Sequence, residues 1–286
     1  MNRETSISSD PSADAASTVA ALPWSYANSI GGMLFRFGAT VRGVTAFALI
    51  TLGVILRKLR AAPDVTFPSI RHELTRSGVK MLPMFLFMSA ALGLIVIGQA
   101  VSRLTNLGAR GLLGPIMVMV IVRELGPLFT AMLVLARVGT RNVIELGTAR
   151  ALGEVETLEA LRIDPIHYLV VPRVIGMALA AFALTTYFII VALVSGYLFA
   201  FLTNVPLRPD EYYQQITEAL NGSDFVILTL KSCLFGVVIA MITCYHGLAQ
   251  PLRLEDIPQA TIRAVAQGIF ACVLLDAFFI VIYLFV

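Results

Sequence analysis

Four ionisable side chains of this sequence lie inside long apolar runs, where a charge is costly and usually has a function. Arg123 and Glu124 are adjacent at the centre of one run, and Lys231 and Asp276 lie in two later runs. At such positions, ionic groups either join helices as a buried pair or form a polar patch in a substrate cavity. The sequence leaves both interpretations open for Arg123 and Glu124.

A proline follows this first charged pair closely. Pro127 has no amide hydrogen, so the carbonyl of Arg123, four residues earlier, loses its helical partner. We therefore predict that the helix is kinked where the charged pair lies.

Lys231 and Asp276 lie at similar depths, counted from the outer end of their runs. We predict that these two side chains form a structural ion pair, because direct attraction requires close approach. Small residues recur at every fourth position of both runs, a spacing that lets helices pack closely. They are Ser232, Gly236 and Ala240 in one run, and Ala264, Gly268 and Cys272 in the other. Asp276 continues the second stripe and should therefore face protein.

The elements that position these residues are predicted membrane spans. Of 286 residues, 58% are hydrophobic and 14% are charged, whereas soluble domains have about 25% charged residues. Five segments are longer than the roughly 20 residues that a spanning helix needs. They are roughly 79–102, 112–136, 166–202, 224–248 and 262–286. We predict an all-α integral membrane protein with five transmembrane helices.

The segment before the first span has a different character. Residues 43–56 are apolar but short for a span, and basic residues flank them on both sides. This pattern favours an amphipathic interfacial helix over about 33–61, although a crossing stays open. Residues 1–30 lack the features of a signal peptide and are expected to be a disordered tail.

Basic residues predict the orientation of the spans. With the N-terminus in the cytoplasm, sixteen of the 21 Lys and Arg residues fall on the inner side and three fall outside. The C-terminus is then outside the membrane. The longest external connection, 203–223, contains the short amphipathic helix pattern EYYQQITEAL.

An acidic segment lies on the inner side between the second and third predicted spans. Residues 147–162 have a helical pattern, with Leu152, Val155 and Leu158 on one face and Leu161 near it. Glu154, Glu156 and Glu159 line the other side, which an anionic leaflet would repel. This pattern favours docking on a soluble partner.

Motifs for enzymatic chemistry are absent from the sequence. There is no phosphate-binding GxxxxGK[ST] loop, GxSxG elbow or HExxH helix. Cys233, Cys244 and Cys272 lie in apolar runs without metal-ligand spacing. We therefore expect no enzyme, no metal, no cofactor and no nucleic-acid partner.

Two long stretches resemble a known family. The run RELGPLFTAMLVLARVGTRNVIELGTARALGEVETLEALRIDPIHYLVVPRV, residues 123–174, is similar to the signature region of MlaE/YrbE-type permeases. KSCLFGVVIAMITCYHGL at 231–248 and the LLDAFF run around Asp276 resemble the last two spans of that family. The resemblance covers roughly residues 70–286, and we take 31–286 as one permease domain.

The resemblance implies an assembly and a function. Such permeases are homodimers bound to cytoplasmic ABC ATPase subunits, with an MCE-domain protein on the outer side. They move phospholipid or other hydrophobic lipid between the inner membrane and the outer envelope. The N-terminus would be cytoplasmic and the C-terminus periplasmic.

The resemblance also implies residue roles. Segment 147–162 would be the coupling helix that docks on the ATPase, and a second set would line the lipid cavity. The coupling set is Glu145, Arg150, Glu154, Glu156, Glu159 and Asp164. The lipid set is Arg123, Glu124, Leu125, Ile97 and Val101.

Two other functions remain as alternatives. An ion-coupled secondary transporter could use the intramembrane charges as a relay, although the sequence has no recognisable inverted repeat. A non-transporting scaffold of an envelope complex would need none of these charges for activity.

Overall fold

A computed structural model of the chain describes residues 38, 40–55, 63–108, 110–202, 209–249, 253–283 and 285. The chain divides into two compact units, residues 1–48 and residues 49–286. The predicted disordered tail lies outside the described residues. Of the predicted interfacial helix, the structure describes a short apolar helix, Thr40–Ile55.

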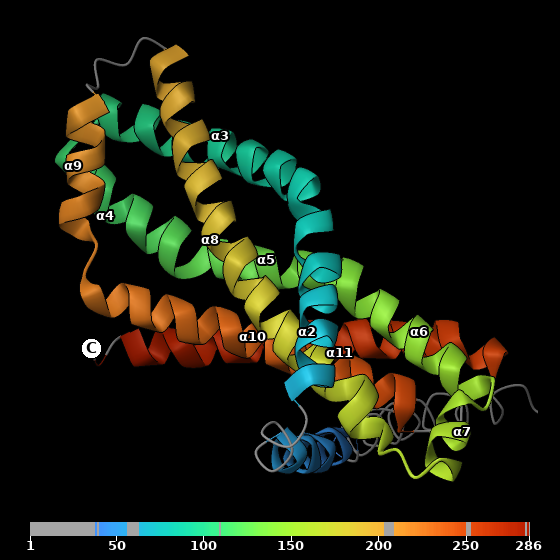
Figure 1. The fold of residues 1–286 in the computed structure, drawn as a ribbon. Coiled ribbons are helices and arrows are strands. Elements are labelled where there is room, and N and C mark those ends of the chain that lie inside the picture. The colour runs from blue at the N-terminus through green and yellow to red at the C-terminus, as the bar shows by residue number, and fades with distance from the viewer. Residues whose placement is uncertain are drawn as a thin grey trace, which may run out of the picture. The chain divides into compact units, whose positions relative to one another are not determined.

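Five helical segments of the larger unit are long and apolar enough to cross a membrane (Figure 1). They are Pro68–Leu104, Leu113–Ala151, Ile166–Phe199, Gly222–Leu248 and Leu254–Tyr283. The described residues contain no strand. The predictions of an all-α integral membrane protein and of five spanning helices are confirmed.

These segments are built from shorter elements. The α-helices are α2 (Pro63–Ser77), α3 (Leu82–Asn106), α4 (Leu113–Met117), α5 (Gly126–Val134), α6 (Thr140–Ala151), α7 (Glu154–Ala160), α8 (Val171–Leu202), α9 (Pro209–Ala219), α10 (Gly222–Leu248) and α11 (Ile257–Tyr283). Three π-helical stretches are η3 (Val118–Leu125), η4 (Leu135–Gly139) and η5 (Ile166–Val170). Three short 3₁₀ turns are η1 (Val79–Met81), η2 (Arg110–Leu112) and η6 (Leu254–Asp256).

The second spanning segment continues well beyond its apolar run, which ends near residue 136. Its last part, α6, is a polar helix whose buried apolar side chains are Val143 and Leu146. Val143 packs against Ala260 and Ala264 of α11. Packing against a neighbouring helix therefore sustains α6 where hydropathy alone would end the span.

The predicted coupling helix over 147–162 is divided in the structure. Its first residues complete α6, and the chain turns at Gly153, whose φ of 78° lies in the left-handed region that glycine adopts readily. The separate helix α7 follows. The single predicted helix rested on the spacing of Leu152, Val155 and Leu158, which continues across Gly153 and so did not reveal the break.

The predicted external helix corresponds to α9, which packs on α4. Tyr212 and Ile216, four residues apart, are its buried face. The Tyr212 hydroxyl donates a hydrogen bond to the Leu193 carbonyl of α8 at 3.1 Å. Burial raises the pKa of Tyr212 well above its ordinary value, so the phenol stays protonated as a donor.

The two small-residue stripes face different neighbours. Gly236 of the α10 stripe faces α8, whereas Ala264 and Gly268 of the α11 stripe face Val143 and Leu135 of the second span. All six stripe residues are buried, and Asp276 is 7% exposed. A Cβ atom at Gly236 would come within 2.5 Å of the Met177 carbonyl oxygen and 2.7 Å of the Ala178 Cα. The α8 backbone therefore approaches α10 as closely as a glycine permits.

We expect Gly236→Ala to lower the thermal unfolding temperature of the purified protein, because backbone atoms of α8 cannot move aside as a flexible side chain could. The cost should be about 1–3 kcal/mol. Gly222→Ala, also in α10 but with nothing within 4 Å of an added Cβ, is the control and should change little. Equal unfolding temperatures for the two variants would contradict the close approach.

Candidate functional site

A buried lysine is the centre of the intramembrane charges. Nζ of Lys231 donates hydrogen bonds to the Arg123 carbonyl at 2.8 Å and to Oε2 of Glu124 at 3.1 Å. It also lies 2.7 Å from Oδ1 of Asp276. An ammonium has three N–H donors, and three oxygens surround this fully buried one. The side chain thus joins α10 to both the second span and α11.

The carbonyl that Pro127 deprives of a helical partner is the one that Lys231 binds. The chain reaches Pro127 through the π-helix η3, and the proline is the second residue of α5. A π-helix changes the usual backbone pairing and is often found at functional sites. A π-helical stretch thus lies where the kink was predicted, and the Arg123 carbonyl in it accepts a hydrogen bond from Lys231.

Arg123 has a partner that the sequence did not indicate. Its Nε lies 2.9 Å from Oδ1 of Asp224, and its Nη2 donates to Oδ2 at 3.1 Å. Asp224 is 2% exposed and also accepts a hydrogen bond from the Asn221 amide at the start of α10. In the sequence Asp224 looks like an ordinary helix-capping residue. The guanidinium also lies over the Tyr283 ring, 5.1 Å from its centroid.

The cluster is only partly covered by the chain itself. The side chains of Arg123 and Glu124 are each 29% exposed, and Leu125 is half-buried. Lys231 and Asp224, by contrast, are shielded almost completely. The second span therefore presents a charged, accessible face at membrane depth.

Two predicted lipid-lining residues lie elsewhere. Ile97 and Val101 of α3 are 0% and 1% exposed. They pack with Leu113, Met117 and Ile121 of the second span. In this conformation both residues are core residues between helices, because their apolar side chains are more stable in that contact than at an open surface.

The predicted coupling residues divide into two groups. Glu154, Glu156 and Glu159 are exposed on α7, and Arg150 pairs with Glu156 at 3.3 Å. Asp164 instead accepts a hydrogen bond from the Ile166 amide at the start of η5.

Glu145 has intramolecular partners. It forms ion pairs with Arg76, Arg141 and Arg173, from α2, α6 and α8. These contacts give Glu145 a role in holding the inner ends of the helices together.

Comparison with known proteins decides the family. The model of the family Permease MlaE matches residues 70–282. This chain belongs to the MlaE permease family. A probable ABC transporter permease protein of Rickettsia felis is 26% identical over 85% of this chain and 91% of its own length.

Two further relatives come from photosynthetic organisms. The protein TRIGALACTOSYLDIACYLGLYCEROL 1, chloroplastic, of Arabidopsis thaliana is 31% identical over 78% of this chain and 63% of its own length. A probable ABC transporter permease protein of Synechocystis is 28% identical over 70% of this chain and 76% of its own length.

Removing the lysine from this permease should destabilise it strongly. We expect Lys231→Met to cost about 3–5 kcal/mol, because two carboxylates at membrane depth lose their counterion. Adding Asp276→Leu should restore part of the loss, since one unpaired charge is then removed too. Thermal unfolding in detergent measures both, with the exposed Lys80→Met as the control. Strictly additive losses would contradict the pairing.

Proposed function

We propose that this chain is the membrane-spanning permease subunit of an ABC transporter that moves phospholipid or another hydrophobic lipid. In this proposal it works as a homodimer in the inner membrane, and a cytoplasmic ABC ATPase supplies the energy. An MCE-domain protein receives or delivers the lipid on the outer side. The permease itself carries out no catalysis. Family membership and the charged face of the second span support the proposal.

The partial exposure of Arg123 and Glu124 is the observation that carries the proposal. Lipid tails cannot solvate such groups, so charges at this depth face other protein or a water-filled cavity. A second copy of the chain placed against this face would cover it and enclose a cavity between the two copies. Leu125, half-buried beside the pair, would then contribute apolar surface for acyl chains.

Arg123 is suited to a lipid headgroup through an exchange of partners. Its planar guanidinium already binds the Asp224 carboxylate along one edge, and a phosphate oxygen pair has similar geometry. A phosphate would have to displace or share this contact. Together with Lys231, Glu124 and Asp276, the site holds three carboxylates and two cations, so its formal charge is negative by one and it does not hold an anion tightly. We infer that the lipid headgroup binds this site only transiently, as transport requires, and is not held tightly.

The helix α7 is the proposed contact with the ATPase. Three exposed carboxylates of α7 lie between Leu152 and Leu161, which are 62% and 66% exposed. Exposed apolar side chains beside a cluster of one charge are typical of an interaction surface with a complementary partner. The distribution of basic residues supports a cytoplasmic position for this surface and a periplasmic C-terminus.

Lipid occupancy tests the proposed site. We expect Arg123→Ala and Glu124→Ala each to reduce the lipid that co-purifies with the complex about tenfold, because a charged hydrogen-bonding group is lost. Arg123→Lys, which keeps the charge without the planar fork, should retain an intermediate amount. Mass spectrometry of extracted lipid gives the measurement.

Arg103→Ala and Glu211→Ala alter exposed charges outside the cluster and are the matched controls. Wild-type lipid occupancy in both Arg123→Ala and Glu124→Ala would contradict the proposal that these residues line a lipid cavity.

A charge reversal tests the docking surface. Glu154→Lys combined with Glu159→Lys should weaken co-purification with the ATPase at least about tenfold, since like charges then face each other across the contact. The unfolding temperature should stay unchanged, because neither carboxylate forms an ion pair with another described residue. The same reversal at Glu211 and Glu218 of α9 is the control, and equal losses from both pairs would contradict docking through α7.

A further inference from the structure

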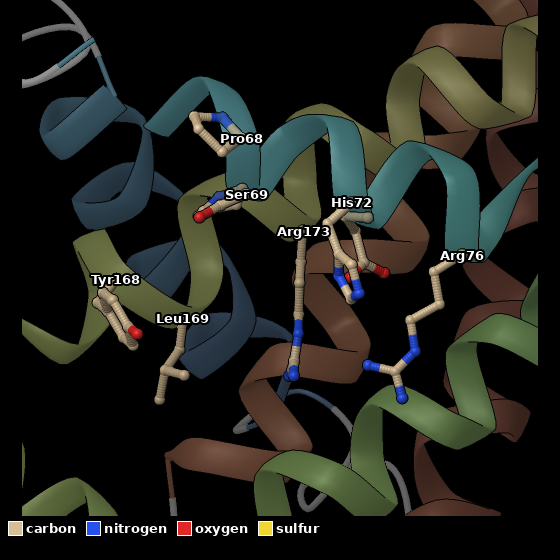
Figure 2. Close-up of a pocket in the computed structure, with 9 residues that line it drawn as sticks. Pro68, Ser69, His72, Arg76, Tyr168, Leu169 and Arg173 are labelled. Atoms are coloured by element: carbon tan, nitrogen blue, oxygen red, sulfur yellow. The ribbon is translucent and has the colours of Figure 1, made fainter. Parts of the chain in front are cut away.

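A second polar site lies apart from the Lys231 cluster, between α2 and the start of the third span. It is a pocket with a cavity volume of about 380 Å³. Figure 2 shows His72 and Arg76 on α2 and Arg173 on α8, with Tyr168 and Leu169 on the neighbouring stretch η5. The side chains of His72, Arg76 and Arg173 extend in the same direction in this view. None of these residues belongs to the proposed lipid cavity.

The ion network beside this pocket has one positive charge too many. It contains three arginines and two glutamates, namely Arg76, Arg141, Arg173, Glu73 and Glu145. Oε1 of Glu73 also accepts a hydrogen bond from the Ser77 hydroxyl at 2.7 Å. The carboxylates therefore cannot neutralise all three guanidinium groups.

Several guanidinium nitrogens of this network lack acceptors. Nη1 of Arg173 is buried without a hydrogen-bond partner among the described residues. Nε and Nη2 of Arg141 are 3.6 Å from the nearest carboxylate oxygens, too far for hydrogen bonds. Buried donors of this kind usually indicate a water or an ion at the site. A net positive charge makes an anion the better fit.

The position of the pocket indicates which anion. Its walls are the first turns of the first and third spanning segments, Pro68–Leu104 and Ile166–Phe199. In the proposed orientation both segments start at the cytoplasmic face, where anionic lipids concentrate and basic pockets between spans bind their headgroups.

We propose that this pocket binds the phosphate group of an anionic lipid headgroup from the cytoplasmic leaflet. Arg173 would offer its unpaired Nη1, while Arg76 and His72 line the same opening. The site goes beyond the proposed transport function and needs from it only the membrane orientation. Tyr168 and Leu169 also line a smaller hollow, about 240 Å³, against Glu154, Thr157 and Leu158 of α7. A bound headgroup would therefore adjoin the proposed coupling helix.

Native mass spectrometry of the full-length protein in detergent tests this site. The probes are dioleoyl phosphatidylglycerol, dioleoyl phosphatidylcholine and inorganic phosphate. We expect the wild type to bind phosphatidylglycerol in preference to phosphatidylcholine. Arg173→Gln should weaken the binding of one phosphatidylglycerol per chain about tenfold, because a charged donor is lost. Arg137→Gln changes an exposed arginine outside the pocket and should bind as the wild type does.

A second variant guards against misfolding, since Arg173 also pairs with Glu145. His72 is exposed on α2, so His72→Glu adds a negative charge at the pocket without breaking that pair. It should weaken phosphatidylglycerol binding as well. Thr75→Glu adds a negative charge on an exposed position of the same helix that does not line the pocket, and it should have a smaller effect.

The outcomes separate the sources of the phosphate group. Binding of inorganic phosphate that depends on Arg173 and His72, without such binding of phosphatidylglycerol, would support the same site with a soluble anion as its ligand. Unchanged binding of both probes in folded Arg173→Gln and in His72→Glu would overturn the proposal. The proposal would also be overturned if these variants lost co-purification with the ATPase but kept wild-type lipid binding. The pocket would then bind a carboxylate of the partner protein. Arg123→Ala should leave phosphatidylglycerol binding at this pocket unchanged. Failure of the pocket proposal can therefore be distinguished from failure of the proposed lipid cavity.

Discussion

The cost of an ammonium group at membrane depth is the constraint on which the rest of this structure depends. No water is available there, so the N–H groups of Lys231 must find oxygens within the protein. The second span supplies a backbone carbonyl and Glu124, and α11 supplies Asp276. Three helices are thereby held in one register, and their close packing follows. Gly236 lets α10 approach α8, while Ala264 packs against Val143 on α6.

The same arrangement connects the charged cluster with the cytoplasmic side. Leu113–Ala151 is helical throughout and carries Arg123 and Glu124 in its first third. It leads through the turn at Gly153 directly into α7. A displacement of α7 would therefore act on the helix that bears the charged face. The π-helical stretches η3 and η4 lie along that helix, and irregular backbone pairing of this kind often marks functional positions. In our account, ATP-driven movement of α7 changes the cavity by way of this one helix.

The sequence predicted those features that depend on composition and local spacing. Apolar runs gave the five spans, and matched depth placed Lys231 beside Asp276. Features that depend on tertiary contact were missed. The bond between Arg123 and Asp224 joins residues 101 positions apart and had no local signal in the sequence. Ile97 and Val101, which the resemblance implied at a lipid cavity, are buried between helices in this single copy of the chain. Gly153 was the available signal for the break before α7.

Transport by the reconstituted complex tests the central claim most directly. Vesicles containing the full-length permease and its co-purified ATPase would be loaded with a fluorescent phospholipid, and lipid transfer would be followed with and without ATP. The account predicts transfer that requires ATP and a hydrolysis-competent ATPase, and that continues when proton and sodium gradients are collapsed. Transfer by the permease alone that follows an ion gradient would contradict it and favour an ion-coupled carrier.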